Sequence, residues 1–124
     1  MTEIEIVGSA SSGREARLQR AILGLAENPP GAEEAKRRPA RPGFAENLVF
    51  EFDEAYTAYV ESFETLPSEE QLLALQAVDT HVSRMVRAKD AELWTERARR
   101  EEAPWAQVRE LAAHVLRVFE WRAP

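Results

Sequence analysis

The sequence predicts a mainly α-helical fold of about five helices packed as a small bundle. Apolar residues recur at three- and four-residue spacings over most of the chain, which is the period of an amphipathic helix. The chain has 124 residues, of which 44% are hydrophobic, and this is enough for one packed core. One or two short strands near the N-terminus would make the fold α+β with a minimal sheet. We therefore expect a single helix-rich domain over residues 1–124.

The N-terminal segment is expected to form a strand, a turn and then a helix. Residues 3–7 alternate polar and β-branched side chains, the pattern of a half-buried strand. Residues 8–13 begin and end with glycine, one step from the spacing of a phosphate-binding loop. That motif requires Lys and then Ser or Thr where Arg14 and Glu15 stand. Ser12 and Glu15 have the spacing of a capping box, so we predict the start of a helix rather than a nucleotide site.

A loop and a second strand are expected next. Residues 29–43 hold four of the seven prolines and no apolar side chain larger than alanine or proline, which indicates a flexible basic loop. Alternate residues of 47–52 are large and apolar, and we interpret this segment as a strand. The alternative is that it begins the following helix. With a strand here, Asp53 is the predicted N-cap of a helix that buries an aromatic face.

The second half of the chain contains the clearest helix signals. Ser68 and Gln71 have the spacing of a capping box. Lys89 and Asp90 are expected to interrupt this helix, with Asp90 capping a shorter one that ends at about Arg100, and Pro104 suits the first position of a last helix. The predicted buried stripes are Leu72, Leu75, Val78, Val82, Met85 and Val86 in the first of these helices, and Trp105, Val108, Ala112, Val115, Leu116 and Phe119 in the last.

Acidic residues are concentrated in the middle of the chain. The net charge of −6 argues against a protein that wraps a nucleic-acid backbone, which needs clustered Lys and Arg. Residues 42–83 contain no Lys or Arg, and we call this segment the acidic block. Its nine acidic residues are Glu46, Glu51, Asp53, Glu54, Glu61, Glu64, Glu69, Glu70 and Asp79. Such a block can steer a cationic partner.

We therefore expect a non-catalytic interaction domain that docks a basic protein partner. Tyrosines stand among the acidic residues, which is the composition of a binding patch with aromatic anchors and a charged rim. The predicted partner-binding residues are Asp53, Glu54, Tyr56, Tyr59, Glu61 and Glu64. Immunity proteins and antitoxins that neutralise cationic nucleases are also small, acidic and helical, and this analogy is one of composition alone.

Two other classes of function are considered. One is a small-molecule or anion-binding regulator that uses the loop from Gly8 to Gly13 and the helix N-terminus after it. The other is an enzyme with His81 or His114 as its base, because only these side chains ordinarily titrate near neutrality. Both histidines adjoin apolar stripes, and the Glu-x-x-His spacing of bundle metal sites does not occur. We predict no catalytic, cofactor or metal site.

The sequence also predicts a cytoplasmic protein without a membrane partner. Residues 1–5 lack the positive segment and apolar run of a signal peptide. No run approaches the ~18 apolar residues of a membrane-spanning helix. The chain contains no cysteine, which fits a reducing compartment.

Overall fold

A computed structural model describes the backbone of residues 2–121 and the side chains of residues 13–121. Within residues 2–121 the chain forms only helices, so the predicted mainly α fold is confirmed. The helices are α1 (Thr2–Ala26), α2 (Ala32–Arg37), α3 (Phe44–Glu61), α4 (Glu69–Arg87), the short 3-10 helix η1 (Ala91–Trp94), α5 (Glu96–Glu101) and α6 (Ala103–Phe119).

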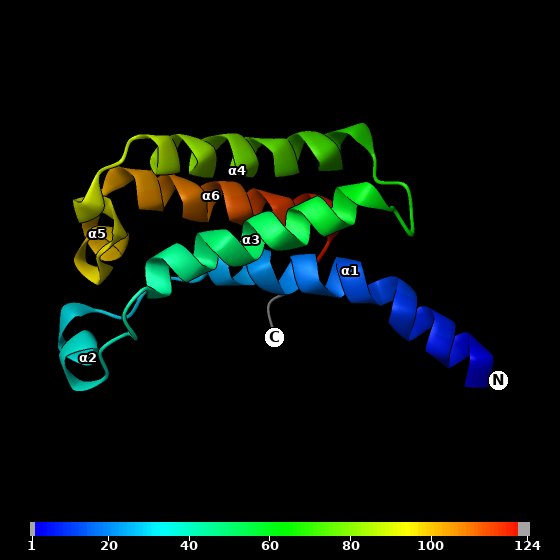
Figure 1. The fold of residues 1–124 in the computed structure, drawn as a ribbon, viewed down its shortest axis with the longest axis horizontal. Helices are drawn as coiled ribbons and strands as arrows, with labels where there is room; N and C mark the ends of the chain where they lie inside the picture. Colours follow the sequence, from blue (N-terminus) through cyan, green and yellow to red (C-terminus); the bar gives the residue numbers. More distant parts are fainter. Residues whose placement is uncertain (1, 122–124) are drawn as a thin grey trace.

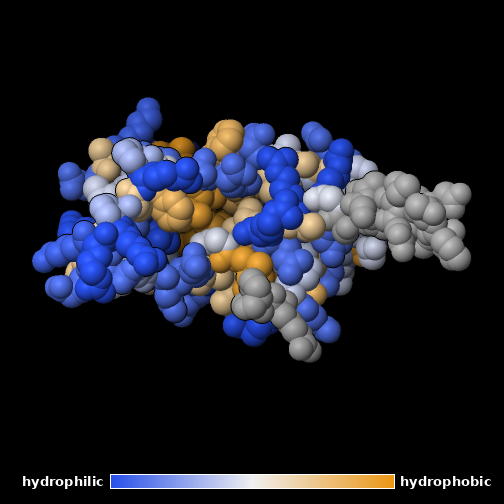
Figure 2. All heavy atoms as spheres, turned by 90° about the horizontal axis from the view of Figure 1, so that it is seen from below, coloured by the Kyte–Doolittle hydropathy of each residue, from blue (hydrophilic) through white to orange (hydrophobic). Residues whose placement is uncertain are grey.

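The four long helices α1, α3, α4 and α6 form a bundle in which successive members run in opposite directions (Figure 1). α1 packs against both α3 and α6, and α4 packs against α6, whereas α3 and α4 approach each other less closely. Viewed from the side of α1 (Figure 2), hydrophilic side chains cover the end of the molecule that carries α2, and apolar surface gathers toward the middle of the bundle.

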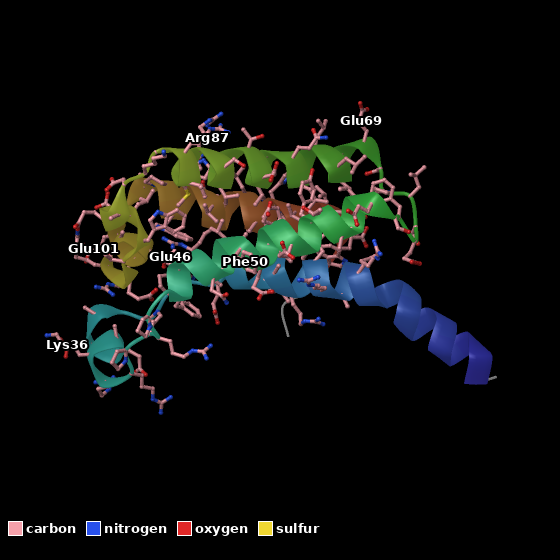
Figure 3. All side chains as sticks on the ribbon, in the orientation of Figure 1. Lys36, Glu46, Phe50, Glu69, Arg87 and Glu101 are labelled. Atoms are coloured by element: carbon pink, nitrogen blue, oxygen red, sulfur yellow. The ribbon has the colours of Figure 1, made fainter. Side chains whose placement is uncertain are left out.

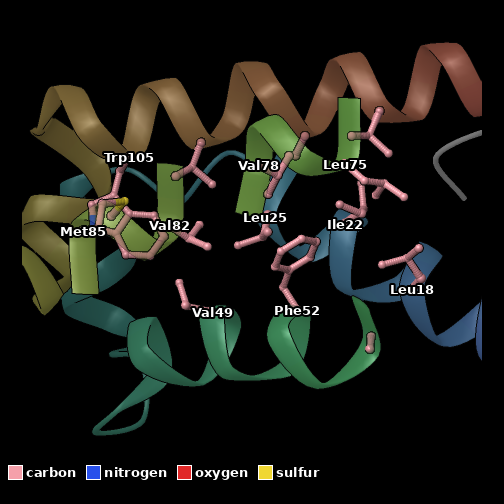
Figure 4. Packing of buried hydrophobic residues seen from close by; sticks show 14 of the residues in the cluster. Leu18, Ile22, Leu25, Val49, Phe52, Leu75, Val78, Val82, Met85 and Trp105 are labelled. Carbon is pink, nitrogen blue, oxygen red and sulfur yellow. The ribbon is translucent and has the colours of Figure 1, made fainter. Parts of the chain in front are cut away.

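The core lies between the four long helices. Phe52 points from α3 into this space, toward Leu25 of α1 and Val78 of α4 (Figure 4). Burying each side chain of this size contributes roughly 1.5–3 kcal/mol. The largest fully buried side chains are Trp105, Phe52, Leu18, Ile22, Leu75, Val78, Val108 and Val115. Most residues of the stripes predicted for α4 and α6 are buried, but Leu72, Leu116 and Phe119 are only partly buried, and Val86 at the end of α4 is 52% exposed.

The predicted N-terminal strand and turn are wrong. Residues 3–7 and 8–13 both lie within α1. An alternation of five residues is too short to separate the period of a strand from that of a helix. Because the helix begins at Thr2, the predicted N-cap at Ser12 is wrong as well.

The second predicted strand is also wrong. Residues 47–52 lie inside α3, and Asp53 is an exposed residue in the middle of that helix rather than its N-cap. α3 begins after Gly43, whose φ of 79° is a left-handed conformation that glycine adopts without steric cost. The loop predicted over residues 29–43 contains the short helix α2, which buries no residue.

In the second half, the predicted start of α4 after Ser68 and the predicted cap at Asp90 are confirmed, but the single short helix expected from Asp90 to about Arg100 is divided into η1 and α5, and α6 begins at Ala103, one residue before Pro104. The Ser68 amide donates to Gln71 Oε1 at 2.9 Å and the Gln71 amide donates to Ser68 Oγ at 3.1 Å, which completes the capping box. Asp90 caps η1 by accepting a hydrogen bond from the Glu92 amide at 3.1 Å. A separate cap at Thr95 then begins α5, since its hydroxyl accepts from the Ala98 amide at 3.0 Å.

Candidate protein-binding groove

A groove runs along the surface between α3 and α4, on the side of the bundle where two neighbouring long helices approach least closely. Its volume is about 520 Å³. We call it the α3/α4 groove and define it by its lining residues, which are Glu46, Val49, Phe50 and Asp53 of α3, Val82, Ser83, Val86 and Arg87 of α4, and Trp94 of η1. Glu46 and Arg87 lie toward the end of the molecule that carries α5, with Phe50 further along α3 (Figure 3).

The walls of the groove present apolar side chains to the surface. Phe50 is 58% exposed and Val86 is 52% exposed, so neither is covered by the chain itself. Val49 and Val82 are buried beneath them and form the floor. Large exposed side chains of this kind, gathered in one concave site, are typical of a binding surface.

Trp94 closes the groove at the η1 end and is held there by the core. Its ring meets that of Trp105 edge to face, with the ring centroids 5.7 Å apart. Trp105 is 1% exposed, and its Nε1–H donates to the Leu93 carbonyl at 2.7 Å. One buried indole of α6 therefore fixes both residues at the end of η1.

Arg99 fixes the neighbouring helix α5. It is the only buried charged residue among those whose side chains the structure describes. Its guanidinium lies 3.2 Å from the Glu96 carboxylate and 5.1 Å from the centroid of the Phe44 ring. The cation–π contact joins α5 to the first residue of α3, so the end of the groove near Glu46 rests on a packed support.

Two carboxylates line the groove, together with the cation Arg87. Glu46 and Asp53 are part of its lining. Asp79 of α4 is not part of the lining; burial, and to a smaller extent the charge of Asp53, raises the pKa of its carboxyl. Burial, and to a smaller extent the charge of Asp79, raises the pKa of the Tyr56 hydroxyl. None of the ion pairs among residues 13–121 includes Glu46, Asp53 or Asp79.

The structure brings only some of the predicted partner-binding residues together. Asp53 lines the groove, and half-buried Tyr56 stacks on Phe52 with the ring centroids 5.4 Å apart. Tyr59 is 2% exposed and belongs to the core, so its predicted role as an aromatic anchor is corrected.

The other three predicted residues are exposed but lie outside the groove lining. Helical spacing places Glu54 and Glu61 on the side of α3 that faces away from the core, and Glu64 is in the loop after α3. The residues that sequence reasoning missed are Phe50 and Val86. Each belongs to an apolar pattern that predicts burial, although each stands at the edge of its helix stripe.

The histidines occupy separate surfaces. His81 is half-buried, and its Nε2–H donates to the Pro104 carbonyl at 2.9 Å. His114 is exposed on α6, in a shallow depression that it shares with Glu69 and Glu70 of α4. Among the residues with described side chains, no three of His, Asp or Glu are grouped so that they could hold a metal ion. None of the helices in the described part of the chain has the length and apolar character to cross a membrane.

The predicted anion-binding loop is wrong, because residues 8–13 continue α1 as helix. The basic residues that follow lie beside α3. Arg14 donates a hydrogen bond to the Ala58 carbonyl, one of the last carbonyls of α3, which have no partner within the helix. Arg17 and Arg20 line a shallow depression between α1 and α3, opposite Glu51.

Comparison with protein-family models, with curated proteins and with solved structures found no match for this chain. The class of protein is therefore defined by the fold and the groove: a helical bundle with an apolar surface groove bordered by carboxylates.

Proposed function

We propose that this chain is a non-catalytic interaction domain that binds a basic partner protein through the α3/α4 groove. The observation that carries the proposal is the exposure of Phe50 and Val86 beside Glu46 and Asp53, two carboxylates that form no ion pair within residues 13–121. The apolar side chains favour a partner that removes them from water. The carboxylates favour a partner that carries positive charge.

An amphipathic helix is the form of partner that suits this surface. The groove runs between two helices, and a third helix can lay its apolar face into such a groove. Its apolar residues would cover Phe50 and Val86, and its basic flank would lie near Glu46 and Asp53. The added helix would occupy the side on which α3 and α4 approach each other least closely.

The acidic block favours one biological form of this proposal. Glu54, Glu61 and Glu64 lie outside the groove lining, where they attract a cationic protein during approach without contacting it in the complex. This acidic composition suits an immunity-protein-like or antitoxin-like role in the cytoplasm, in which the chain neutralises a cationic protein.

A selection experiment with helical peptides tests the proposal and needs no identified partner. A display library of helical peptides of about 18 residues, the length of α3, is selected against the wild-type chain. We expect enrichment of peptides that combine an apolar face with net positive charge. These peptides should lose about tenfold or more in affinity for Val86→Glu, because the substitution places a charge in the apolar wall.

Leu73→Glu is the matched control. Leu73 is 58% exposed on the same helix, but it lies on the flank beside His114 rather than in the α3/α4 groove. The selected peptides should bind this variant as they bind the wild type. The proposal is wrong if no peptide is enriched, or if binding is lost with Leu73→Glu and retained with Val86→Glu.

A further inference from the structure

The two walls of the α3/α4 groove carry charges of opposite sign. The wall formed by α3 contributes the carboxylates of Glu46 and Asp53, and the wall formed by α4 contributes the guanidinium of Arg87. All three residues are exposed, and none of them takes part in an ion pair among residues 13–121. The charges of both walls are therefore available to a segment that binds between them.

These charges have fixed positions along the groove. Glu46 and Arg87 lie on opposite walls toward the same end of the molecule, the end that carries α5 (Figure 3). Asp53 lies further along α3 by two helical turns, which is about 10.5 Å along the helix axis. The exposed ring of Phe50 occupies the turn between the two carboxylates. The wall of α3 is therefore negative over two turns, whereas the wall of α4 is positive at one end.

We infer that the opposite charges of the two walls fix the direction in which the partner helix lies in the groove. This inference rests on the proposed function and specifies the chemistry of the partner. One flank of the partner helix carries Lys or Arg at two positions seven residues apart, which face the carboxylates of α3. The other flank carries an acidic residue that faces Arg87. Apolar residues between the flanks cover Phe50 and Val86.

The geometry of an amphipathic helix links its flanks to its direction. Turning the helix end for end, with its apolar face kept against the groove floor, exchanges the two flanks. The basic flank then faces Arg87, and the acidic flank faces Glu46 and Asp53. Like charges brought together in this way oppose association. The reversed arrangement is therefore excluded by repulsion, while the apolar contacts are equally good in both directions.

Arg87 is the residue that makes the groove directional. A helix with basic residues on both flanks would place one of them against the carboxylates of α3 in either direction. Its second basic flank would meet Arg87 each time and be repelled. The partner is therefore a helix whose opposite charges are segregated by flank, rather than a uniformly basic one.

Two synthetic peptides of the same composition test the inference. Each is an amphipathic helix of about 18 residues, the length of α3, with leucines on its groove-facing side. One flank carries two Lys residues seven positions apart and the other carries Glu, and the flanks are exchanged between the two peptides. We expect the peptides to bind in opposite directions, each with a preference of about tenfold or more for one direction.

A nitroxide spin label at one end of the peptide reports the direction. Trp94 closes the groove at the η1 end, so a label bound at that end broadens the indole N–H signal of Trp94 in NMR spectra far more than a label at the other end. With the label at the N-terminus, one peptide should broaden this signal and the other should leave it sharp. Moving the label to the C-terminus should exchange the two results.

A triple variant inverts the charges of the groove walls. Glu46→Lys, Asp53→Lys and Arg87→Glu together make the wall of α3 positive and that of α4 negative. Each peptide should then bind in the direction opposite to the one it takes on the wild-type chain. If this variant does not fold, the comparison of the two peptides on the wild-type chain decides the question alone.

The matched control makes the same charge changes on the same helices outside the groove. Glu54→Lys, Glu61→Lys and Arg84→Glu change exposed residues of α3 and α4 that do not line it. Both peptides should keep the directions that they take on the wild-type chain. A reversal in this control would show that the overall surface charge, rather than the walls, sets the direction, and it would overturn the inference.

The other outcomes distinguish this inference from the proposed function. The inference is overturned if both peptides bind in the same direction, if either binds equally in both, or if inverting the walls changes neither direction. The groove remains the binding site in that case, provided that Val86→Glu weakens both peptides. If neither peptide binds, or if Val86→Glu affects neither, the proposed function fails as well. A dimer of the free chain that Val86→Glu abolishes, seen by sedimentation, would make a second copy the occupant and overturn both.

Discussion

Trp105 connects the end of the α3/α4 groove to the core, and Trp105→Phe tests this connection. The indole is 1% exposed, donates to the Leu93 carbonyl at 2.7 Å and meets the ring of Trp94 edge to face. Phenylalanine keeps an aromatic ring at this position but is smaller and has no N–H group. The substitution therefore removes one hydrogen bond and part of the packing while the helix itself is preserved.

The expected loss of stability follows from three contributions. A buried carbonyl left without its donor costs about 1–2 kcal/mol. The space left by the smaller ring costs about another 1–2 kcal/mol, and the weaker contact with Trp94 costs about 0.5 kcal/mol. We expect Trp105→Phe to lower the free energy of unfolding by about 3 kcal/mol.

Urea unfolding followed by far-ultraviolet circular dichroism measures this change. The control is Trp121→Phe, since Trp121 is only half-buried and stacks on Phe119, with the ring centroids 4.2 Å apart, after the end of α6. We expect the control to lose less than about 1 kcal/mol, because the smaller ring can still stack and little space is left. A Trp105→Phe variant that loses no more than the control would refute the argument.

Three further substitutions test individual features of the fold. Burial, and to a smaller extent the charge of Asp53, raises the pKa of Asp79. The ionised carboxylate therefore opposes folding at pH values above this pKa. The opposition disappears as the pH falls through the pKa and the carboxyl becomes protonated. Asp79→Asn should therefore raise the Tm at about pH 7 and leave it unchanged at about pH 3, as measured by calorimetry; a lower Tm at about pH 7 would contradict this. Burial, and to a smaller extent the charge of Glu15, raises the pKa of Tyr59 from 10.0 to about 12. Between about pH 10 and about pH 12 the tyrosine therefore ionises in the unfolded chain but not in the folded chain. The wild type loses stability over this pH range as a result. Tyr59→Phe should gain about 1 kcal/mol relative to the wild type between about pH 7 and about pH 11, and equal differences in urea unfolding at the two pH values would count against it. Ser68→Ala removes one half of the capping box of α4 and should cost about 1 kcal/mol in urea unfolding; a cost below about 0.3 kcal/mol would show that the cap contributes little.

The helices of the second half could be predicted because several local signals agree there. The stripe of α4 begins directly after a complete capping box and ends near the cap at Asp90. The stripe of α6 follows Pro104 in the first turn. Each signal is local in sequence, and tertiary packing reinforces all of them.

The two strands were predicted wrongly because the same apolar residues fit both periods over a short distance. Residues 47–52 alternate as a strand would, yet Phe52 also continues a helical series with Ala45, Val49, Ala55 and Tyr59, all of which are buried. The helical series is longer and places one complete face in the core. The longer period therefore determines the structure, and a window of six residues cannot show it.

The groove itself could not be predicted from periodicity. Phe50 and Val86 are apolar, and a sequence pattern assigns them to the interior as readily as it assigns Val49 or Val82. Their exposure depends on the separation of α3 and α4, which results from the packing of α3 against α1 and of α4 against α6. The acidic block can be recognised in the sequence. Which of its residues line the groove and which lie outside it depends on where each helix face points in the bundle.

That division leads to a kinetic prediction. Glu54 and Glu61 are exposed outside the groove lining, and water and salt screen their charges, so they should act mainly on the rate of association. Glu46 and Asp53 line the groove and would be covered in the complex, so they should act mainly on the rate of dissociation. In stopped-flow measurements with a basic helical peptide selected against the wild-type chain, Glu54→Gln with Glu61→Gln should slow association severalfold at low salt and have little effect at high salt.

Glu46→Gln with Asp53→Asn should instead speed dissociation about tenfold at both salt concentrations, because a contact from which water is excluded is screened less by salt. If both double variants changed only the association rate, and to the same extent, the acidic block would act as one diffuse charge. The partner would then be attracted by the whole acidic surface, and the carboxylates that line the groove would have no distinct role in holding it.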